Sequence, residues 1–294
     1  MTTDIVLALG GGGTRGIAHV GVLRFLEDHD FRIRALAGTS IGSVVAALYA
    51  SGIRAKQLEI LLESVEPASL FGGFLSEGPG LLSLREIRGW LIERFGERRF
   101  EDLELPCAAV VVDVHTQQTL FLHEGEIVPA LLGSVAVPGI FPPVEYPPYL
   151  LIDGGTLDPV PVRAARMLAP NLPVVAVSLQ TGLGETSAPF AYPIHVPKPI
   201  QTRIRRLRIA QAFNIFVESV LIGQRQLSAM RLAIDAPDVL IHPAVNDFSI
   251  FESVEVSAIV KRGEQAALQA YPGLRKVGTL TSRLRRRLRR QSNP

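Results

Sequence analysis

The chain has 294 residues, of which 47% are apolar and 20% are charged, and its formal net charge is +2. These proportions are ordinary for a globular protein and leave room for one large core or two smaller ones. The single cysteine, Cys107, excludes an internal disulfide, and its apolar neighbours predict a buried structural thiol. The N-terminus lacks the basic and apolar regions of a signal peptide, so the expected location is cytoplasmic.

Charge is unevenly distributed along the chain. Residues 279–294 contain no acidic residue and carry six arginines, which are Arg283, Arg285, Arg286, Arg287, Arg289 and Arg290. The remainder keeps a net charge of about −4, and no nucleic-acid partner is expected for such a mildly acidic body. We therefore expect one folded domain over residues 1–278 and a basic C-terminal tail over residues 279–294.

The pattern of apolar residues predicts alternating strands and helices. Short apolar runs predict strands at 4–9, 33–37, 107–114, 118–123, 149–152, 173–179 and 238–241. Helical periodicity predicts helices at 16–29, 41–63, 83–95, 126–134, 161–169, 201–230 and 253–270. This alternation is typical of the α/β class, with helices on both faces of a mostly parallel sheet. The uncharged stretch 35–53 is long enough to cross a membrane, but its glycines and hydroxyl residues favour a strand, a turn and a buried helix.

A glycine-rich loop, GGGGTRG, follows the first predicted strand and precedes the first predicted helix. Gly11, Gly13 and Gly16 match the G-x-G-x-x-G pattern of dinucleotide-binding proteins. That pattern also requires an acidic residue at the end of the second strand, where this sequence has none. The loop closes on Arg15-Gly16, whereas a P-loop closes on Gly-Lys-Ser/Thr. Its backbone amides are therefore better suited to the short-lived oxyanion of an ester under attack.

The second predicted strand runs into GTSIGS, in which Gly38, Ser40 and Gly42 form the pattern G-x-S-x-G. A serine between a strand and a helix in this pattern is typical of a nucleophile elbow. The sharp turn needs glycine on both sides of the serine and thrusts the hydroxyl outward. The alternative is that Ser40 simply caps the helix that follows.

Asp153 in YLLIDGG is the best-marked candidate for the base. An apolar run ends on this carboxylate and is followed by Gly154 and Gly155, which predicts a site at the carboxyl end of a strand, on the same rim as the glycine loop and the elbow. Burial under apolar neighbours would raise the pKa of Asp153 toward the value that a base needs at pH 7. Asp113 is the other candidate for the base, but we expect its carboxylate to accept hydrogen bonds from nearby backbone amides or a hydroxyl. The alternative for Asp153 is that it only forms a turn and has no catalytic role.

A histidine base is the other possibility. The chain has six histidines, none within a recognisable motif. His195 and His242 lie downstream of Asp153, so the order Ser, Asp, His of the α/β hydrolases is formally available.

Together these motifs resemble the patatin-like phospholipases, particularly their bacterial members and the related neuropathy target esterase group. GGGGTRGIAHVGVL is similar to the family's oxyanion segment, GTSIGS to its nucleophile elbow and DGG to its catalytic acid motif. SVAVPGIFPPV, residues 134–144, is similar to a further signature of the family. The resemblance spans residues 4–180 and keeps the motifs in the family's order.

The resemblance implies a three-layer α/β/α fold and a serine acyl hydrolase that cleaves carboxylic esters of phospholipids or lysophospholipids through an acyl-enzyme, with no metal and no cofactor. It implies Ser40 as the nucleophile and Asp153 as the base, without histidine. The remaining residues that it assigns are the oxyanion donors Gly11, Gly12 and Gly13, the motif-supporting glycines Gly16, Gly38, Gly42, Gly154 and Gly155, and Arg15, which would steady the loop or meet an anionic substrate. Asp158 departs from the family pattern, which has asparagine after DGG.

Lipid substrates imply a surface at which the protein works. Leu280, Leu284 and Leu288 recur every four residues among the arginines of the tail, a pattern that predicts a helix lying on an anionic bilayer, peripheral at the inner face of the membrane. A disordered basic end is the alternative. Two other functions stay open, namely a catalytically silent membrane or regulatory module with the same fold and a dinucleotide-dependent enzyme.

Overall fold

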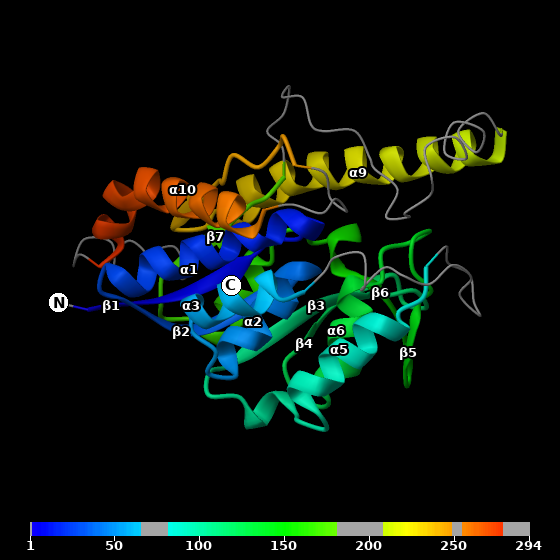
Figure 1. Cartoon of the computed structure of the whole chain (residues 1–294), viewed down its shortest axis with the longest axis horizontal. Coiled ribbons are helices and arrows are strands. Elements are labelled where there is room, and N and C mark those ends of the chain that lie inside the picture. The colour runs from blue at the N-terminus through cyan, green and yellow to red at the C-terminus, as the bar shows by residue number, and fades with distance from the viewer. Residues whose placement is uncertain (1, 66–81, 181–207, 249–254, 279–294) are drawn as a thin grey trace.

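The computed structural model describes residues 2–65, 82–180, 208–248 and 255–278. The basic tail and His195 lie outside these residues. In the described part, the strands are β1 (Thr3–Leu9), β2 (Phe31–Thr39), β3 (Cys107–Asp113), β4 (Gln118–Leu122), β5 (Val144–Tyr146), β6 (Tyr149–Asp153), β7 (Val174–Val177) and β8 (Val239–Ile241). The α-helices are α1 (Ala18–Asp28), α2 (Ile41–Ala50), α3 (Ala55–Glu63), α5 (Arg85–Phe95), α6 (Ile127–Val135), α7 (Val162–Leu168), α9 (Arg208–Asp235) and α10 (Val256–Val277), as Figure 1 shows.

The strands form one sheet in the order β5-β6-β3-β2-β1-β7-β8, with β4 paired to β3 beside this path. The pairs β3-β2, β2-β1, β1-β7 and β7-β8 are parallel. The pairs β3-β4, β3-β6 and β6-β5 are antiparallel. The sheet is therefore mixed and mostly parallel, which confirms the predicted α/β class.

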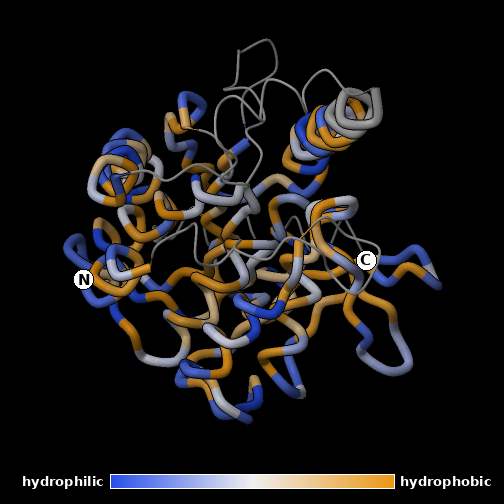
Figure 2. The backbone as a smooth tube through the Cα atoms, turned by 45° about the vertical axis from the view of Figure 1, so that its right-hand side comes forward, coloured by the Kyte–Doolittle hydropathy of each residue, from blue (hydrophilic) through white to orange (hydrophobic). Residues whose placement is uncertain are grey.

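Two apolar layers sandwich the sheet because successive side chains of a strand point to opposite faces. In β1, Ile5, Leu7 and Leu9 pack into a large cluster with α1, α2, α6 and α10. Val6 and Ala8, which alternate with them, pack into a second cluster with α7, and Leu232 of α9 lies against that cluster. Figure 2 shows the apolar segments concentrated in the interior and the hydrophilic ones toward the outside. The three-layer α/β/α arrangement is thus confirmed.

The strands β2 and β6 share one edge of β3 and meet there end to end. Thr39, the last residue of β2, pairs with Val110 of β3, and Asp153, the last residue of β6, pairs with the next residue, Val111. Because β2 runs parallel to β3 and β6 runs antiparallel to it, the carboxyl ends of β2 and β6 point at each other. Strand pairing therefore places Ser40, which directly follows Thr39, beside Asp153.

Some boundaries differ from those predicted. The helix predicted at 41–63 is two helices, α2 and α3, because Gly52 has a φ of 99° and turns the chain between them. The short strand β5 lies among prolines and was not predicted. The stretch 35–53 contains the end of β2, a turn and the buried helix α2, as the sequence predicted. Among the described residues, we find no helix with the length and apolar character needed to cross a membrane.

Cys107 at the start of β3 is buried and free, as predicted. Burial raises the pKa of its thiol to about 12, so the thiolate does not form at neutral pH. This cysteine is a small apolar core residue.

Candidate active site

Ser40 lies on the sharp turn between β2 and α2. Its φ of 56° is in the left-handed region, which costs a residue with a side chain roughly 1–2 kcal/mol. Hydrogen bonds hold the turn: the Ser40 amide donates to Oγ of Ser134 at 3.0 Å, and that hydroxyl donates to the carbonyl of Val110 at 2.7 Å. The amide and hydroxyl of Ser43 donate to the Ser40 carbonyl at 2.9 and 2.6 Å. This geometry is that of a nucleophile elbow.

Two glycines make the elbow sterically possible. A Cβ at Gly38 would collide with the backbone of Gly42 and Ser43. A Cβ at Gly42 would collide with the backbone carbonyls of Leu9 and Gly10, at the end of β1. Close packing at these positions joins the elbow to the glycine loop, so neither can move without the other.

Three further motif glycines also fill positions where a side chain does not fit. A Cβ at Gly16 would press into the side chain of Ile41 in α2. A Cβ at Gly154 would collide with the Val110 carbonyl, and one at Gly155 would lie 2.9 Å from Oδ1 of Asp153. These glycines keep β6 and the glycine loop close to the elbow.

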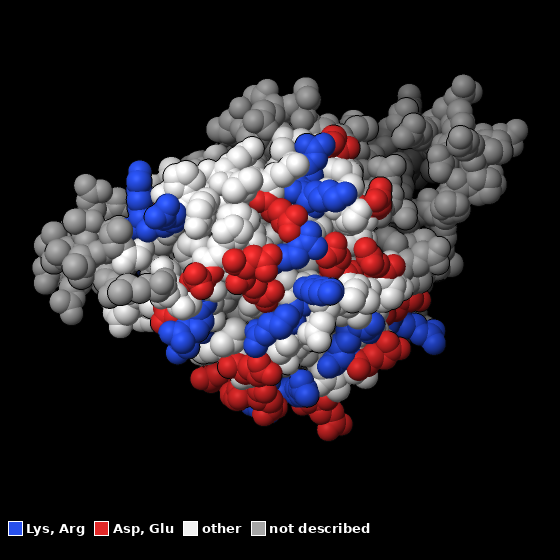
Figure 3. Space-filling model, turned by 60° about the vertical axis from the view of Figure 1, so that its left-hand side comes forward, with Lys and Arg blue, Asp and Glu red and all other residues white. Residues whose placement is uncertain are grey.

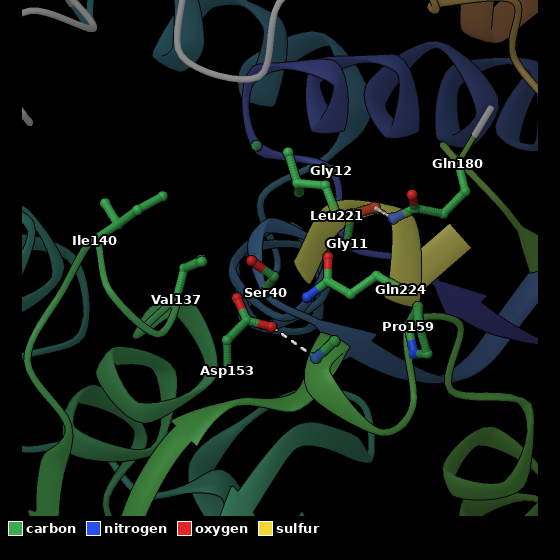
Figure 4. A pocket seen from close by; sticks show the side chains of 12 residues that line it. Gly11, Gly12, Ser40, Val137, Ile140, Asp153, Pro159, Gln180, Leu221 and Gln224 are labelled. Carbon is green, nitrogen blue, oxygen red and sulfur yellow. Dashed lines mark hydrogen bonds between the residues drawn. The ribbon is translucent and has the colours of Figure 1, made fainter. Parts of the chain in front are cut away.

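Asp153 is buried at the carboxyl end of β6, with 2% of its surface exposed. Burial raises the pKa of its carboxyl group to about 6, against the opposing effects of the Ser40 hydroxyl and of the Gly155 amide. That amide donates to Oδ1 of Asp153 at 2.6 Å. Figure 4 shows the Ser40 hydroxyl and the Asp153 carboxylate facing each other. The predicted nucleophile and base therefore lie together, with the carboxylate in the range that suits a base near pH 7.

The glycine loop lies on the other side of Ser40, with Gly11, Gly12 and Gly13 lining the same pocket. The expectation that all three amides point to an oxyanion needs one correction. The Gly11 amide donates to the carbonyl of Pro159 at 3.0 Å, so this N–H is already used. In the described part of the chain, the amides of Gly12 and Gly13 have no hydrogen-bond partner and remain available.

Arg15 and His19 are buried next to the glycine loop and form hydrogen bonds with backbone carbonyls. Nε of Arg15 donates to the carbonyl of Phe248 at 2.8 Å, and Nη2 donates to that of Asn246 at 3.4 Å. These contacts hold the Arg15 side chain against the segment that follows β8, and its role in the loop stays a prediction. The ring of His19, which the sequence did not single out, bonds through Nε2 to the Gly10 carbonyl at 2.8 Å. Burial lowers the pKa of His19 to about 4, so the ring is neutral and Nε2 is the donor.

Asp158 is buried where the family pattern has asparagine. Burial raises the pKa of its carboxyl group to about 7, while the charges of Arg231 and Arg163 act in the opposite direction. Two hydrogen bonds are made by the backbone of Asp158. Its amide donates to the Gly154 carbonyl at 2.8 Å, and its carbonyl accepts from Oγ1 of Thr39 at 2.9 Å. Backbone groups of this segment thus bind the ends of β2 and β6 together.

A pocket of about 50 Å³ opens at the junction of these elements. Beyond the residues named in the motifs, Figure 4 shows side chains from three other segments around it. Val137 and Ile140 come from the segment 134–144, which the sequence had marked, and Gln180 follows β7. Leu221 and Gln224 come from α9 and carried no sequence signal, since they are ordinary residues of a helical pattern.

The rival acid does not belong to this pocket. The Asp113 carboxylate accepts hydrogen bonds from the amides of His115, Thr116 and Leu150 and from the Thr116 hydroxyl. Although desolvation acts in the opposite direction, these bonds lower the pKa of Asp113 to about 2. This acid closes the turn between β3 and β4, as the sequence suggested.

No histidine among the described residues lines the pocket, and His242 is exposed beyond β8. Histidine, cysteine and acidic side chains in these residues also form no cluster of three or more that could hold a metal ion. The end of β2, where a dinucleotide-binding protein holds the ribose, is occupied by the elbow. The site is thus built around Ser40 and Asp153.

A strained serine elbow, a buried carboxylate and free loop amides on an α/β sheet define a class of proteins built like serine hydrolases. Residues 7–166 match the family model of the patatin-like phospholipases, which is more than half of the chain. The chain belongs to the patatin-like phospholipase family.

Several known proteins are similar to it. An uncharacterised NTE family protein of Mycobacterium tuberculosis is 33% identical over 183 residues, which cover 60% of this chain and 49% of that protein. Human patatin-like phospholipase domain-containing protein 6 is 32% identical over 193 residues, covering 60% of this chain and 13% of that protein. A lysophospholipase NTE1 of Debaryomyces hansenii is 27% identical over 293 residues, covering 88% of this chain and 17% of that protein.

Among solved structures, VipD from Legionella pneumophila superimposes with a TM-score of 0.50 at 14% identity, covering 92% of this chain and 66% of that one. This likeness supports the fold. The matched region spans about half the length of the mycobacterial relative and a smaller share of the eukaryotic ones.

Proposed function

We propose that this protein is a serine acyl hydrolase that cleaves carboxylic ester bonds of phospholipids or lysophospholipids. Ser40 is the nucleophile and Asp153 the general base. The observation that carries the proposal is the end-to-end meeting of β2 and β6, which brings the hydroxyl beside a buried carboxylate whose pKa is raised to about 6. The family to which the chain belongs supports the lipid substrate class.

Acylation follows from this arrangement. Asp153 takes the hydroxyl proton as Oγ of Ser40 attacks the ester carbonyl carbon, and the carbonyl oxygen becomes an oxyanion. The amides of Gly12 and Gly13 donate to that oxyanion, and one such donor contributes about 3–4 kcal/mol in other hydrolases. The tetrahedral intermediate then collapses, the bond to the leaving alcohol breaks, and Asp153 returns the proton to the alcohol oxygen.

Deacylation uses the same groups a second time. A water molecule gives a proton to Asp153 and attacks the acyl carbon, the oxyanion forms again beside Gly12 and Gly13, and Ser40 leaves with the proton from Asp153. The fatty acid is released and the free serine is restored. The raised pKa of Asp153 helps in both acylation and deacylation, because its carboxyl group must gain and lose a proton in each step.

The size of the pocket limits what it encloses. A volume of about 50 Å³ is far below the 300–1,000 Å³ or so of pockets that enclose a drug-sized ligand. The described residues therefore leave room for the reacting ester group and its nearest carbons, and we propose that the rest of the lipid extends beyond the space that they line.

The proposal predicts release of fatty acid from phosphatidylcholine or lysophosphatidylcholine by the wild-type protein and none by Ser40→Ala. Ser40→Ala should stay folded, which its melting curve checks, since this change removes one hydroxyl. A folded wild-type protein that releases no fatty acid from either lipid would favour the silent regulatory module. A thermal shift with NAD or NADP would support the dinucleotide alternative.

Turnover should also depend on the protonation of Asp153. Because the protonated acid cannot accept the serine proton, we expect kcat/KM for a soluble short-chain ester to fall about tenfold per pH unit below about 6. A pH profile measured where the protein stays folded checks this. A limb near pH 7 that disappears in His242→Ala would point to a histidine base instead.

We also propose that the basic tail, residues 279–294, adds electrostatic attraction to an anionic membrane. Each basic residue near such a surface contributes roughly 1 kcal/mol at most, and salt weakens the effect. Truncation after Gly278 should weaken binding to phosphatidylserine vesicles while turnover of a soluble short-chain ester is kept. Equal vesicle binding by the truncated and complete chains would remove the reason for this proposal.

A further inference from the structure

Helix α9 has an inner side that reaches the pocket. Leu221 and Gln224, three residues apart, line the pocket, as Figure 4 shows. Val217 and Ser228 on the same side are buried. At its C-terminal end, the guanidinium of Arg166 in α7 donates to the carbonyls of Asp235 and Ala236, which fixes α9 to the body. One face of α9 is therefore part of the site.

Between residues 215 and 234, where its side chains are described, the outer face of α9 is exposed and carries no charge. Its large apolar side chains are well exposed: Ile215 67%, Phe216 50%, Ile222 53%, Met230 61% and Ile234 74%. The other exposed residues between 215 and 234 are Ser219, Gly223, Gln226 and Ala233. At 100° per residue all nine lie on one side of the helix, over a length of roughly 30 Å.

This uncharged face is a local feature of the surface. On the side of the molecule shown in Figure 3, acidic and basic side chains are interspersed. Elsewhere in the described residues such charges form ion pairs, as Arg24 of α1 does with Glu59 and Glu264. In the part of α9 whose side chains are described, the charged residues are only partly exposed and lie off the outer face; they are Glu218, Arg225, Arg231 and Asp235. Contiguous apolar surface of this kind marks an interaction site.

We propose that the outer face of α9, from Ile215 to Ile234, lies on the surface of a lipid bilayer. The inference rests on the proposed function, since a lipid substrate is what places a bilayer next to this site. A face without charge of either sign suits the boundary between headgroups and acyl chains, where apolar side chains leave water.

The position of the pocket favours a lipid bilayer over a protein partner on the outer face of α9. The pocket that the described residues form encloses about 50 Å³, which is room for the ester group of a lipid and not for its whole length. Because the inner face of α9 lines that pocket, docking of the outer face puts the pocket within about one helix diameter, roughly 10 Å, of the lipid. The same helix then anchors the protein and borders the reacting ester.

The double variant Ile222→Glu/Met230→Glu tests this inference. We expect its partition onto phosphatidylcholine vesicles, measured by co-sedimentation in 0.5 M NaCl, to fall at least tenfold from the wild-type value. Neutral lipid and high salt suppress any contribution of the arginines in the tail. Turnover of a soluble short-chain ester should be unchanged, because neither side chain lines the pocket.

The matched control is Leu268→Glu on α10, where an apolar side chain is likewise 59% exposed. It should bind vesicles as the wild type does. Equal binding by the double variant and the wild type, or an equal loss in Leu268→Glu, would overturn the inference. So would a wild-type dimer in sedimentation velocity that the double variant converts to monomers, because a second copy would then cover the face.

The same measurements keep this inference apart from the proposed function. Loss of vesicle binding in the double variant supports docking whatever the ester assay gives. If the wild type bound vesicles but hydrolysed neither the soluble ester nor lipid, the hydrolase proposal would fail and the docking surface would stand.

Discussion

Replacing Asp153 with asparagine is expected to lower kcat for ester hydrolysis by about a thousandfold, within the range for loss of a general base. The amide keeps the size of the side chain and an oxygen that accepts from the Gly155 amide, but it cannot take the proton of Ser40. Steady-state kinetics on a soluble ester checks this. Single His→Ala variants should keep their turnover, and a comparable loss in any of them would contradict a base without histidine.

The same variant should be more stable than the wild type at neutral pH. Burial holds the pKa of Asp153 at about 6, above the ordinary value of 3.8, so the ionised form is disfavoured in the folded state. The contribution of Asp153 to the free energy of unfolding is fully present below about pH 4 and is lost as pH rises through about 6. The loss amounts to roughly 3 kcal/mol. We therefore expect Asp153→Asn to melt at a higher temperature at pH 8, with the difference shrinking toward pH 4.

Asp113 provides a control, because its replacement by asparagine should change the melting temperature in the opposite direction. Its pKa is lowered to about 2 by the bonds that it accepts, so its carboxylate stabilises the fold above pH 4 or so, and this stability is lost as pH falls toward 2. Asp113→Asn should therefore melt at a lower temperature than the wild type at pH 8. A lower melting temperature for Asp153→Asn as well would show that Asp153 is a structural acid.

Gly42→Ala should abolish turnover and destabilise the protein by about 3 kcal/mol, the upper part of the usual range for overpacking. The new Cβ would meet the backbone carbonyls of Leu9 and Gly10, which have no freedom to yield because they belong to β1 and the glycine loop. Any shift that relieves this contact moves Ser40 away from the amides of Gly12 and Gly13.

Gly223→Ala on α9 is the matched control, because a Cβ there meets nothing within 4 Å. It should stabilise the protein by about 0.5–1 kcal/mol, as alanine does in place of glycine within a helix. Chemical denaturation and ester turnover measure both variants. A Gly42→Ala protein as stable and active as Gly223→Ala would mean that the elbow does not pack against β1.

Local motifs made much of the site predictable. Glycine, serine and aspartate at fixed spacings next to apolar runs predicted the elbow at Ser40, the loop at Gly11 to Gly13 and the strand ending at Asp153. Each depends on backbone geometry over a few residues, which sequence patterns report well. The helix pattern at 41–63 failed at Gly52, because apolar periodicity continues across a turn that a single glycine allows.

Features that depend on distant parts of the chain could not be predicted. The antiparallel direction of β6 is set by its pairing with β3, and only this pairing explains how Asp153 reaches Ser40. The engagement of the Gly11 amide by Pro159 joins residues 148 positions apart. Gln224 reaches the pocket because α9 packs against α7 and against the turn at Gly154–Thr156, which no local pattern records.

We propose Ser40 as the reactive nucleophile of the site, activated by Asp153. The most direct measurement is labelling with a fluorophosphonate probe, followed by mass spectrometry of the modified peptide. We expect one adduct on Ser40 in the wild type, none in Ser40→Ala and much slower labelling in Asp153→Asn. Equal labelling of the wild type and Ser40→Ala, or an adduct on another residue, would contradict it.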